Sequence, residues 1–147
     1  MDFSEFEKKI GYTFKNKDLL YEALSHSSYA NEYRHGRSSN ERLEFLGDSV
    51  LSIVVSVHLF THFKHLPEGE LTKIRASLVC ENALFELSKK IDLGKYILLG
   101  KGEENSGGRE RPSIVSDAFE AVIAAVYLDG GMDAATVSCF FKSSRDF

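Results

Sequence analysis

The stretch Asn40-Glu41-Arg42-Leu43-Glu44-Phe45-Leu46-Gly47-Asp48-Ser49-Val50-Leu51 opens the apolar segment that decides the fold of this chain. Apolar residues at helical spacing predict one long helix over residues 41–63. Glu41, Glu44 and Asp48 lie at positions i, i+3 and i+7, so one face of this helix carries all three carboxylates. We expect the helix to bury an apolar stripe formed by Leu43, Leu46, Val50, Ile53, Val54 and Val57.

Two residues of the stretch carry separate predictions. Asn40 follows polar residues and is of a type that favours the N-cap position, so the helix is expected to begin there. Gly47 lies inside the helix, where glycine costs about 1 kcal/mol relative to alanine. We therefore expect another segment to approach the helix closely at Gly47.

A second apolar helix is predicted over residues 113–128, and its only charged residues are Asp117 and Glu120. Paired acids on a helix are more often solvated surface. Here both helices are otherwise nearly all apolar or small, so we expect them to be largely buried. Four carboxylates gathered in a partly buried cleft repel each other and lose hydration, at a cost of several kcal/mol per ion.

A hard divalent cation resolves that conflict, because Mg²⁺ takes oxygen ligands and is typically held by a few carboxylates while it works on phosphates. All four candidate ligands are carboxylates, and neither cysteine nor histidine is among them. This ligand set favours Mg²⁺ or Mn²⁺ over zinc. The chemistry that fits is metal-assisted attack of water on a phosphodiester.

The remaining pattern predicts an all-α domain. The 147 residues suit one domain with a real core. No strand-length window alternates between turn signals. Further helices are expected over residues 3–10, 18–26, 68–79 and 82–90 and from residue 133, with a polar loop over 31–39 and a mobile connector over 100–112.

Composition bounds the partners and the compartment. The net charge of −4 argues against a non-specific nucleic-acid binder but permits a local basic patch. Cys80 and Cys139 have no disulfide-framework spacing and are expected to be reduced core thiols. The longest apolar runs, residues 53–60 and 121–128, are too short to span a bilayer, and no leader is visible. We expect a soluble, cytoplasmic protein without a membrane partner.

Residues 40–51 resemble the signature segment of the ribonuclease III family. Further matches follow in the family's order at residues 68–72, 75–79, 102–109, 117–121 and 127–131. The resemblance implies an all-helical endonuclease domain that forms a homodimer, with a groove for double-stranded RNA and one acidic centre per protomer. It also implies a role in RNA processing, in maturation and decay of rRNA and mRNA.

By resemblance, Glu44, Asp48, Asp117 and Glu120 hold Mg²⁺, with Glu120 the least replaceable. Glu41 and Glu68 match two further acids near the scissile phosphate. Glu70 competes for the second of these positions, but the glycine that follows Glu68 favours Glu68.

Phe45 matches the aromatic residue that inserts into a socket on the other protomer. Without the resemblance, an ordinary core phenylalanine is the better expectation for Phe45.

Candidate RNA-binding residues are the basic side chains around the acids. Lys73 and Arg75 follow Glu68 on the same helix, although a solvated face is an equal alternative for them. The other candidates are Arg34, Arg37, Arg109 and Arg111. A-form RNA offers shape, phosphates and 2′-hydroxyls more readily than base edges, so duplex RNA rather than a sequence motif is the expected substrate.

Weaker alternatives stay open. His58, His62 and His65 have metal-ligand spacing, but at a helix C-terminus imidazoles interact favourably with the helix dipole. A di-iron bundle requires two Glu-x-x-His motifs, and this chain has one, at residues 32–35. A non-catalytic relative would have lost one of the four acids.

Relatives of the bacterial type usually continue into a double-stranded-RNA-binding domain, which this chain lacks. We therefore expect an isolated nuclease domain or a minimal member of the family. The expected reaction is Mg²⁺-dependent cleavage of duplex RNA, leaving 5′-phosphates and 3′-hydroxyls.

Overall fold

The computed structural model describes residues 2–33 and 38–136, and within these ranges every regular element is a helix. A single isolated bridge joins Ser25 to Leu98, and the described residues contain no strand. The predicted all-α class is confirmed. The helices are α1 (Ser4–Ile10), α2 (Lys17–Ala23), α3 (Ser27–Tyr33), α4 (Glu41–His62), α5 (Glu68–Val79), α6 (Glu81–Lys90), α7 (Leu93–Tyr96), α8 (Lys101–Asn105), the 3₁₀ helix η1 (Gly108–Glu110), α9 (Pro112–Gly130) and α10 (Met132–Ala135).

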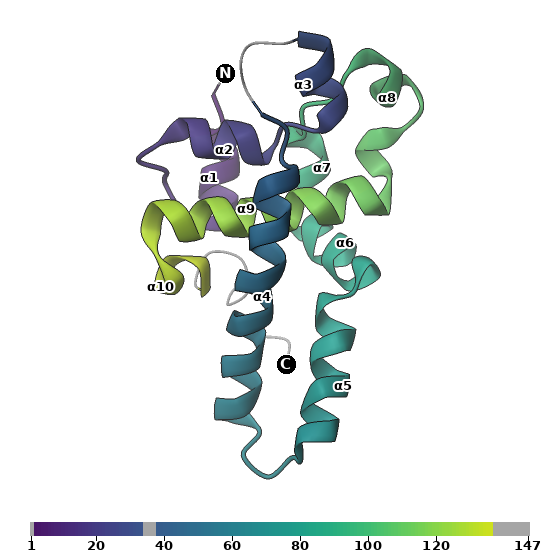
Figure 1. Ribbon diagram of the computed structural model, residues 1–147. Coiled ribbons are helices and arrows are strands. Elements are labelled where there is room, and N and C mark those ends of the chain that lie inside the picture. The colour runs from purple at the N-terminus through teal and green to yellow at the C-terminus, as the bar shows by residue number, and fades with distance from the viewer. Residues whose placement is uncertain (1, 34–37, 137–147) are drawn as a thin grey trace.

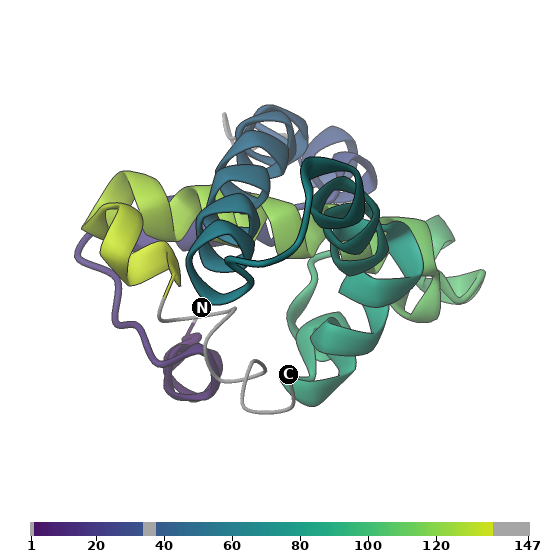
Figure 2. The same ribbon diagram turned by 90° about the horizontal axis from the view of Figure 1, so that it is seen from below.

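Helix α9 forms the centre of the fold. It is buried almost all round, as expected for a helix with few polar residues. Helices α2, α4, α6, α7 and α10 pack against it. Figure 1 shows the first half of α4 crossing α9 near the middle of α9, and Figure 2 shows the same crossing from below. These five helices are thus placed by the helix that carries Asp117 and Glu120.

Beyond the crossing, α4 leaves the core and pairs with α5 in a helical hairpin, which we call the arm (residues 52–79; Figure 1). The chain reverses before Pro67, whose missing N–H group and fixed φ suit the position just ahead of α5. No residue of α5 is fully buried. The fully buried residues of the arm therefore come from α4, where Val55 is 0% and Leu59 3% exposed, and Leu71 and Ile74 of α5 pack against the core while partly exposed.

The apolar stripe of α4 is only partly as predicted. Leu43, Val50 and Val54 are buried, whereas Ile53 is 51% and Val57 58% exposed. The expectation that these last two residues are core is wrong, because past the crossing α9 no longer covers that side of α4. Cys80 is also exposed rather than a core thiol, and Cys139 lies outside the described residues.

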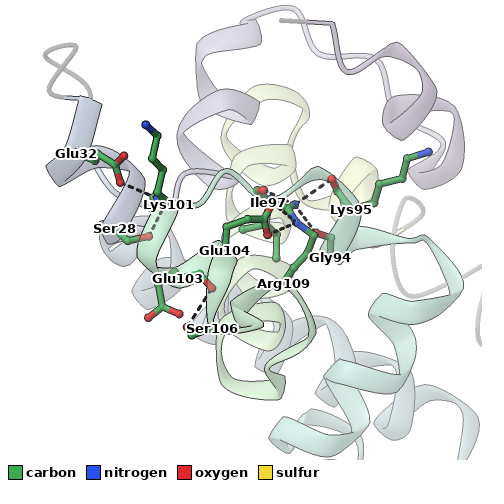
Figure 3. A network of polar contacts seen from close by, with 11 residues as sticks. Ser28, Glu32, Gly94, Lys95, Ile97, Lys101, Glu103, Glu104, Ser106 and Arg109 are labelled. Carbon is green, nitrogen blue, oxygen red and sulfur yellow. Dashed lines mark hydrogen bonds and ion pairs between the residues drawn. The ribbon is translucent and has the colours of Figure 1, made fainter.

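Two segments predicted as loops are helical. Helix α3 extends to Tyr33, and the glycine-rich segment that follows Leu99 contains α8 and η1. Ser28 Oγ accepts a hydrogen bond from the Gly100 N–H (2.9 Å), and the Glu32 carboxylate accepts one from the Lys101 N–H (2.8 Å). These two contacts satisfy free donors at the start of α8 (Figure 3).

Arg109 fixes the other end of this segment. Its guanidinium donates to the carbonyl oxygens of Gly94, Lys95 and Ile97 and pairs with Glu104 (Figure 3). The mobile connector that the glycines predicted is thus a structured segment that leads into α9.

By length and composition alone, the whole of α4 could cross a membrane. The prediction that no segment is long enough considered only the uninterrupted apolar runs, residues 53–60 and 121–128. Core helices of soluble proteins pass the same test. The first half of α4 packs on α9, and the second half buries Val55 and Leu59 but exposes Ile53, Val57 and Phe60.

Candidate active site

The backbones of α4 and α9 touch at the crossing. A Cβ atom placed on Gly47 would lie 1.8 Å from the carbonyl oxygen of Glu120, well inside van der Waals contact. Only a residue without a side chain permits so close an approach. The close approach of another segment that we predicted at Gly47 is thus confirmed. The contact sets the two acidic faces against each other.

Three predicted acids come together at the crossing. One carboxylate oxygen from each of Glu44, Asp117 and Glu120 lies within 4.8 Å of the other two. Glu120 is 9% exposed, while Asp117 lies at the open edge. Asp48, one turn after Glu44, hydrogen-bonds with Glu120. The structure therefore gathers all four acids, three of them around one point.

Crowding and burial shift the protonation of these groups. Burial raises the pKa of Glu120 to about 8, with further contributions from the hydrogen bond and charge of Asp48 and from Glu44 and Asp117. Burial also raises the pKa of Glu44, as do the negative charges of Asp117, Asp48 and Glu41. Burial and the neighbouring acids thus both disfavour the ionised form of Glu120.

The cluster fits a hard divalent cation. Its donors are all carboxylate oxygens, the ligands that Mg²⁺ and Mn²⁺ prefer. In the described ranges no lysine or arginine forms an ion pair with any of the four acids. A cation would supply the positive charge that now comes from a proton.

The start of α4 is anchored to the segment after α2. The Asn40 N–H donates to the Ser25 carbonyl oxygen at 2.8 Å, and the Asn40 amide donates to the Ala23 carbonyl oxygen at 3.1 Å. Asn40 occupies the N-cap position as predicted, but its side chain holds α2 instead of capping α4. Glu41, the first residue of α4, is close enough to raise the pKa of Glu44.

Glu68 is not brought to the acids within one chain. It begins α5, at the end of the arm remote from the crossing, and accepts a hydrogen bond from Thr72 (Figure 1). Its role near the scissile phosphate stays a prediction.

The predicted RNA-binding residues differ in what they contact. Lys73 is exposed and 3.7 Å from Glu70, and Arg75 donates to Ser56 Oγ at 3.0 Å. The donors of Arg109 are used inside the fold, and Arg111 pairs with Glu103. Arg34 and Arg37 lie outside the described residues. Lys73 and Arg75 remain the more available candidates.

Phe45 is 77% exposed on α4, so the alternative that it is an ordinary core residue is wrong. The rings of His58 and His62 stack at 4.1 Å, and His62 Nδ1 donates to the His58 carbonyl oxygen at 2.9 Å. Among the described residues, neither histidine joins a group of three or more metal-capable side chains.

Sequence reasoning missed one acid beside the cluster. Burial raises the pKa of Asp117, and the negative charge of Glu81, at the start of α6, raises it further. Only the helical face shared by Glu81, Leu84 and Ser88 could have signalled this, and only together with the packing of α6 on α9.

A family model described as Ribonuclease-III-like matches residues 16–143. The chain belongs to the ribonuclease III family. Ribonuclease 3 of Caldanaerobacter subterraneus subsp. tengcongensis is 59% identical over 128 residues, which are 87% of this chain and 56% of that protein. Ribonuclease 3 of Clostridium perfringens is 60% identical over 131 residues, which are 89% of this chain and 55% of that protein. This chain therefore spans about half the length of the ribonuclease III relatives that it matches.

Two solved nuclease-domain structures of ribonuclease III from Campylobacter jejuni share this fold. Both are 42% identical to the chain, with TM-scores of 0.90 and 0.89. The match covers 99% of this chain in each case, and 99% and 96% of the Campylobacter chains. The first is described as showing structural flexibility in the region involved in dimer formation. The described fold is thus that of a ribonuclease III nuclease domain.

Proposed function

We propose that this chain is the nuclease domain of a cytoplasmic endoribonuclease that cleaves double-stranded RNA in a divalent-metal-dependent reaction and acts in RNA processing. The observation that carries this proposal is the meeting of four acids from α4 and α9 at a contact that only Gly47 permits. Family membership supports it, since none of the four acids is lost.

Glu44, Asp117 and Glu120 would hold the cation, Mg²⁺ or Mn²⁺, with Asp48 beside Glu120. When bound, such an ion activates water and offsets charge that develops on the phosphate. Glu120 would bind such a cation in its ionised form, which burial and the neighbouring acids disfavour in the metal-free protein. Water adds to phosphorus and the bond to the 3′-oxygen breaks, which leaves a 5′-phosphate and a 3′-hydroxyl.

We also propose that the protein is a homodimer formed through the exposed face of α4. Phe45, Ile53, Val57 and Phe60 lie along one side of this helix, and all are more than half exposed. Large exposed apolar side chains gathered on one side of a helix favour an interaction site. Burial against a second copy would remove it from water.

The arm contains a cleft that would receive the Phe45 side chain of a second protomer. A cleft of about 400 Å³ between α4 and α5 is lined by Ser56, Val57, Phe60, Leu71, Thr72 and Arg75, among others. Isologous pairing of two antiparallel α4 helices would bring Phe45 of one protomer to the arm of its partner. The same pairing would carry Glu68 toward the partner's acids, which accounts for its distance from the acids of its own chain.

RNA affinity would come from basic residues near the acids, with Lys73 and Arg75 as the available candidates. Because each phosphate contact releases counterions, binding should weaken steeply as salt rises. A di-iron function finds no support, since the candidate Glu32 binds the start of α8.

The experiment is incubation of the purified chain with long double-stranded RNA at low salt, with Mg²⁺ or with EDTA, beside single-stranded RNA of the same sequence. We expect cleavage of the duplex only, only with Mg²⁺, and products that carry 5′-phosphates. Cleavage in EDTA would contradict the metal requirement. Tight Mg²⁺-dependent binding of duplex RNA without cleavage would favour the non-catalytic alternative.

A further inference from the structure

Arg75 lies on the face of α5 that is turned toward α4. Four residues at positions i, i+3, i+4 and i+7 share this face and line the cleft of about 400 Å³ between the two helices: Glu68, Leu71, Thr72 and Arg75. Lys73 lies off this face, and its side chain is 78% exposed. The two basic residues of α5 therefore have different surroundings.

A hydrogen bond fixes the Arg75 guanidinium at the wall of this cleft. Arg75 Nη1 donates to Ser56 Oγ on α4 at 3.0 Å. Ser56 Oγ donates its own proton to the Ser52 carbonyl oxygen at 2.7 Å, which leaves its lone pairs to accept from Arg75. The guanidinium is thus held between the two helices of the arm.

The guanidinium forms no ion pair in the part of the chain that the structure describes. Arg75 is half-buried, and none of the ion pairs within residues 2–33 and 38–136 includes it. Glu68 lines the same cleft, but its carboxylate accepts a hydrogen bond from Thr72. The apolar residues of the cleft are Val57, Leu59, Phe60 and Leu71. A charge that loses water against apolar walls requires compensating contacts, and the single protomer supplies one hydrogen bond, to Ser56.

An aromatic ring would supply a further contact of the required kind. A guanidinium is planar, so it donates hydrogen bonds through its edge while its face stacks on an aromatic side chain. The bond from Arg75 to Ser56 is made by the edge. Phe45, which is 77% exposed, is the aromatic side chain that antiparallel pairing of α4 would bring to this cleft.

We propose that Arg75 stacks on the Phe45 ring of a second protomer, which makes Arg75 a residue of the dimer interface. Lys73 then remains as the candidate RNA ligand of α5. The inference rests on the proposed homodimer and names the charged contact that holds Phe45 in the cleft. The contact occurs twice in a symmetric dimer.

The test is the dissociation constant of the dimer, measured by sedimentation equilibrium for single and double variants. Arg75→Gln should raise this constant about five- to thirtyfold, because two cation–π contacts are lost per dimer. In a Phe45→Leu background the same substitution should change the constant by less than about twofold, since leucine offers no ring. Phe45→Tyr keeps a ring, and in that background the effect of Arg75→Gln should persist. Thermal melts show whether each variant is folded.

The matched control is Lys73→Gln, which removes the other positive charge of α5 from a different face. It should leave the dissociation constant of the dimer within about twofold of wild type. Binding of duplex RNA, measured at protein concentrations where each variant is a dimer, separates the two roles further. Lys73→Gln should reduce the slope of log affinity against log salt by about one, and Arg75→Gln should leave that slope unchanged.

Equal weakening of the dimer by Arg75→Gln in all three Phe45 backgrounds would overturn the stacking contact, because the loss would not depend on the ring. A dimer unaffected by Arg75→Gln, with a reduced salt slope, would assign Arg75 to RNA instead. A wild type that stays monomeric at all concentrations would overturn the homodimer and this contact together. Each of these results leaves the proposed metal-dependent cleavage standing, since product formation measures that reaction separately.

Discussion

The two halves of α4 differ in what they bury and what they expose. In its first half, α4 packs against α9 and places carboxylates where burial raises their pKa values. In its second half, α4 leaves the core with α5 and exposes Ile53, Val57 and Phe60 to water. Buried like charges and exposed apolar surface are both unfavourable for an isolated chain. Each half therefore indicates a missing partner, a cation at the crossing and a second apolar surface at the arm.

The substitution with the largest expected effect tests whether Phe45 and the arm form the dimer interface. Phe45→Ala should weaken a dimer by roughly 4–8 kcal/mol, since two symmetric contacts each lose a buried aromatic side chain worth about 2–4 kcal/mol. Sedimentation should show monomers at concentrations where wild type is dimeric, and cleavage should fall as the protein is diluted. Leu128→Ala, which removes an exposed apolar side chain from the end of α9, is the control and should leave the dimer intact. An unchanged dimer would place the interface elsewhere.

The next prediction tests the crossing as a chemical site. Glu120→Gln should lower the cleavage rate by about 10³-fold or more, near 4 kcal/mol in the barrier, because a neutral amide is a poor Mg²⁺ ligand. Without metal, its free energy of unfolding should match or exceed that of wild type, since a crowded buried acid is gone. Glu5→Gln on α1 is the control of equal charge change. Wild-type cleavage by Glu120→Gln at millimolar Mg²⁺ would contradict the assignment.

The backbone contact at the crossing makes a third prediction. Gly47→Ala should lower the free energy of unfolding by about 1–3 kcal/mol or more, because the new methyl group would overlap the Glu120 carbonyl and push α4 away from α9. Chemical denaturation measures this change. Gly69→Ala provides the contrast, since Gly69 is also helical but has no atom within 4 Å of its would-be Cβ. That substitution should raise stability by up to about 1 kcal/mol.

The fourth prediction concerns the pH dependence of stability in the metal-free protein. The pKa of Glu120 is about 8 in the folded chain, against an ordinary value of 4.5. Between these values the folded chain holds a proton that the unfolded chain has released. Its contribution to the free energy of unfolding therefore falls as pH rises, by up to about 1.4 kcal/mol per pH unit. Denaturation in EDTA between about pH 5 and 8 measures this slope.

Two changes should flatten that slope. Saturating Mg²⁺ replaces the proton on Glu120, and Glu120→Gln removes the titrating group. The apparent affinity for Mg²⁺ should rise over the same pH range, because fewer protons compete with the cation. A slope that is identical in wild type and Glu120→Gln would mean that other groups dominate the pH dependence.

Local sequence information predicted most of the helices and the membership of the acidic cluster. Spacing placed Glu44 with Asp48 and Asp117 with Glu120 on two apolar helices, and Gly47 predicted the close contact between segments. These predictions succeeded because helical periodicity and the cost of an internal glycine are local properties. Helices α3 and α8 were missed because contacts distant in sequence, such as that between Glu32 and Lys101, stabilise them.

Only the tertiary structure decided which apolar face of α4 is buried and that α5, which Glu68 begins, starts at the end of the arm remote from the crossing. It also showed that Arg109 holds the segment before α9 from within the fold. Periodicity assigns residues to faces of a helix, but the crossing of α4 with α9 and the turn at Cys80 decide what each face meets. The sequence alone therefore determined the chemical groups of this protein, and the packing of its helices determined which of those groups act together.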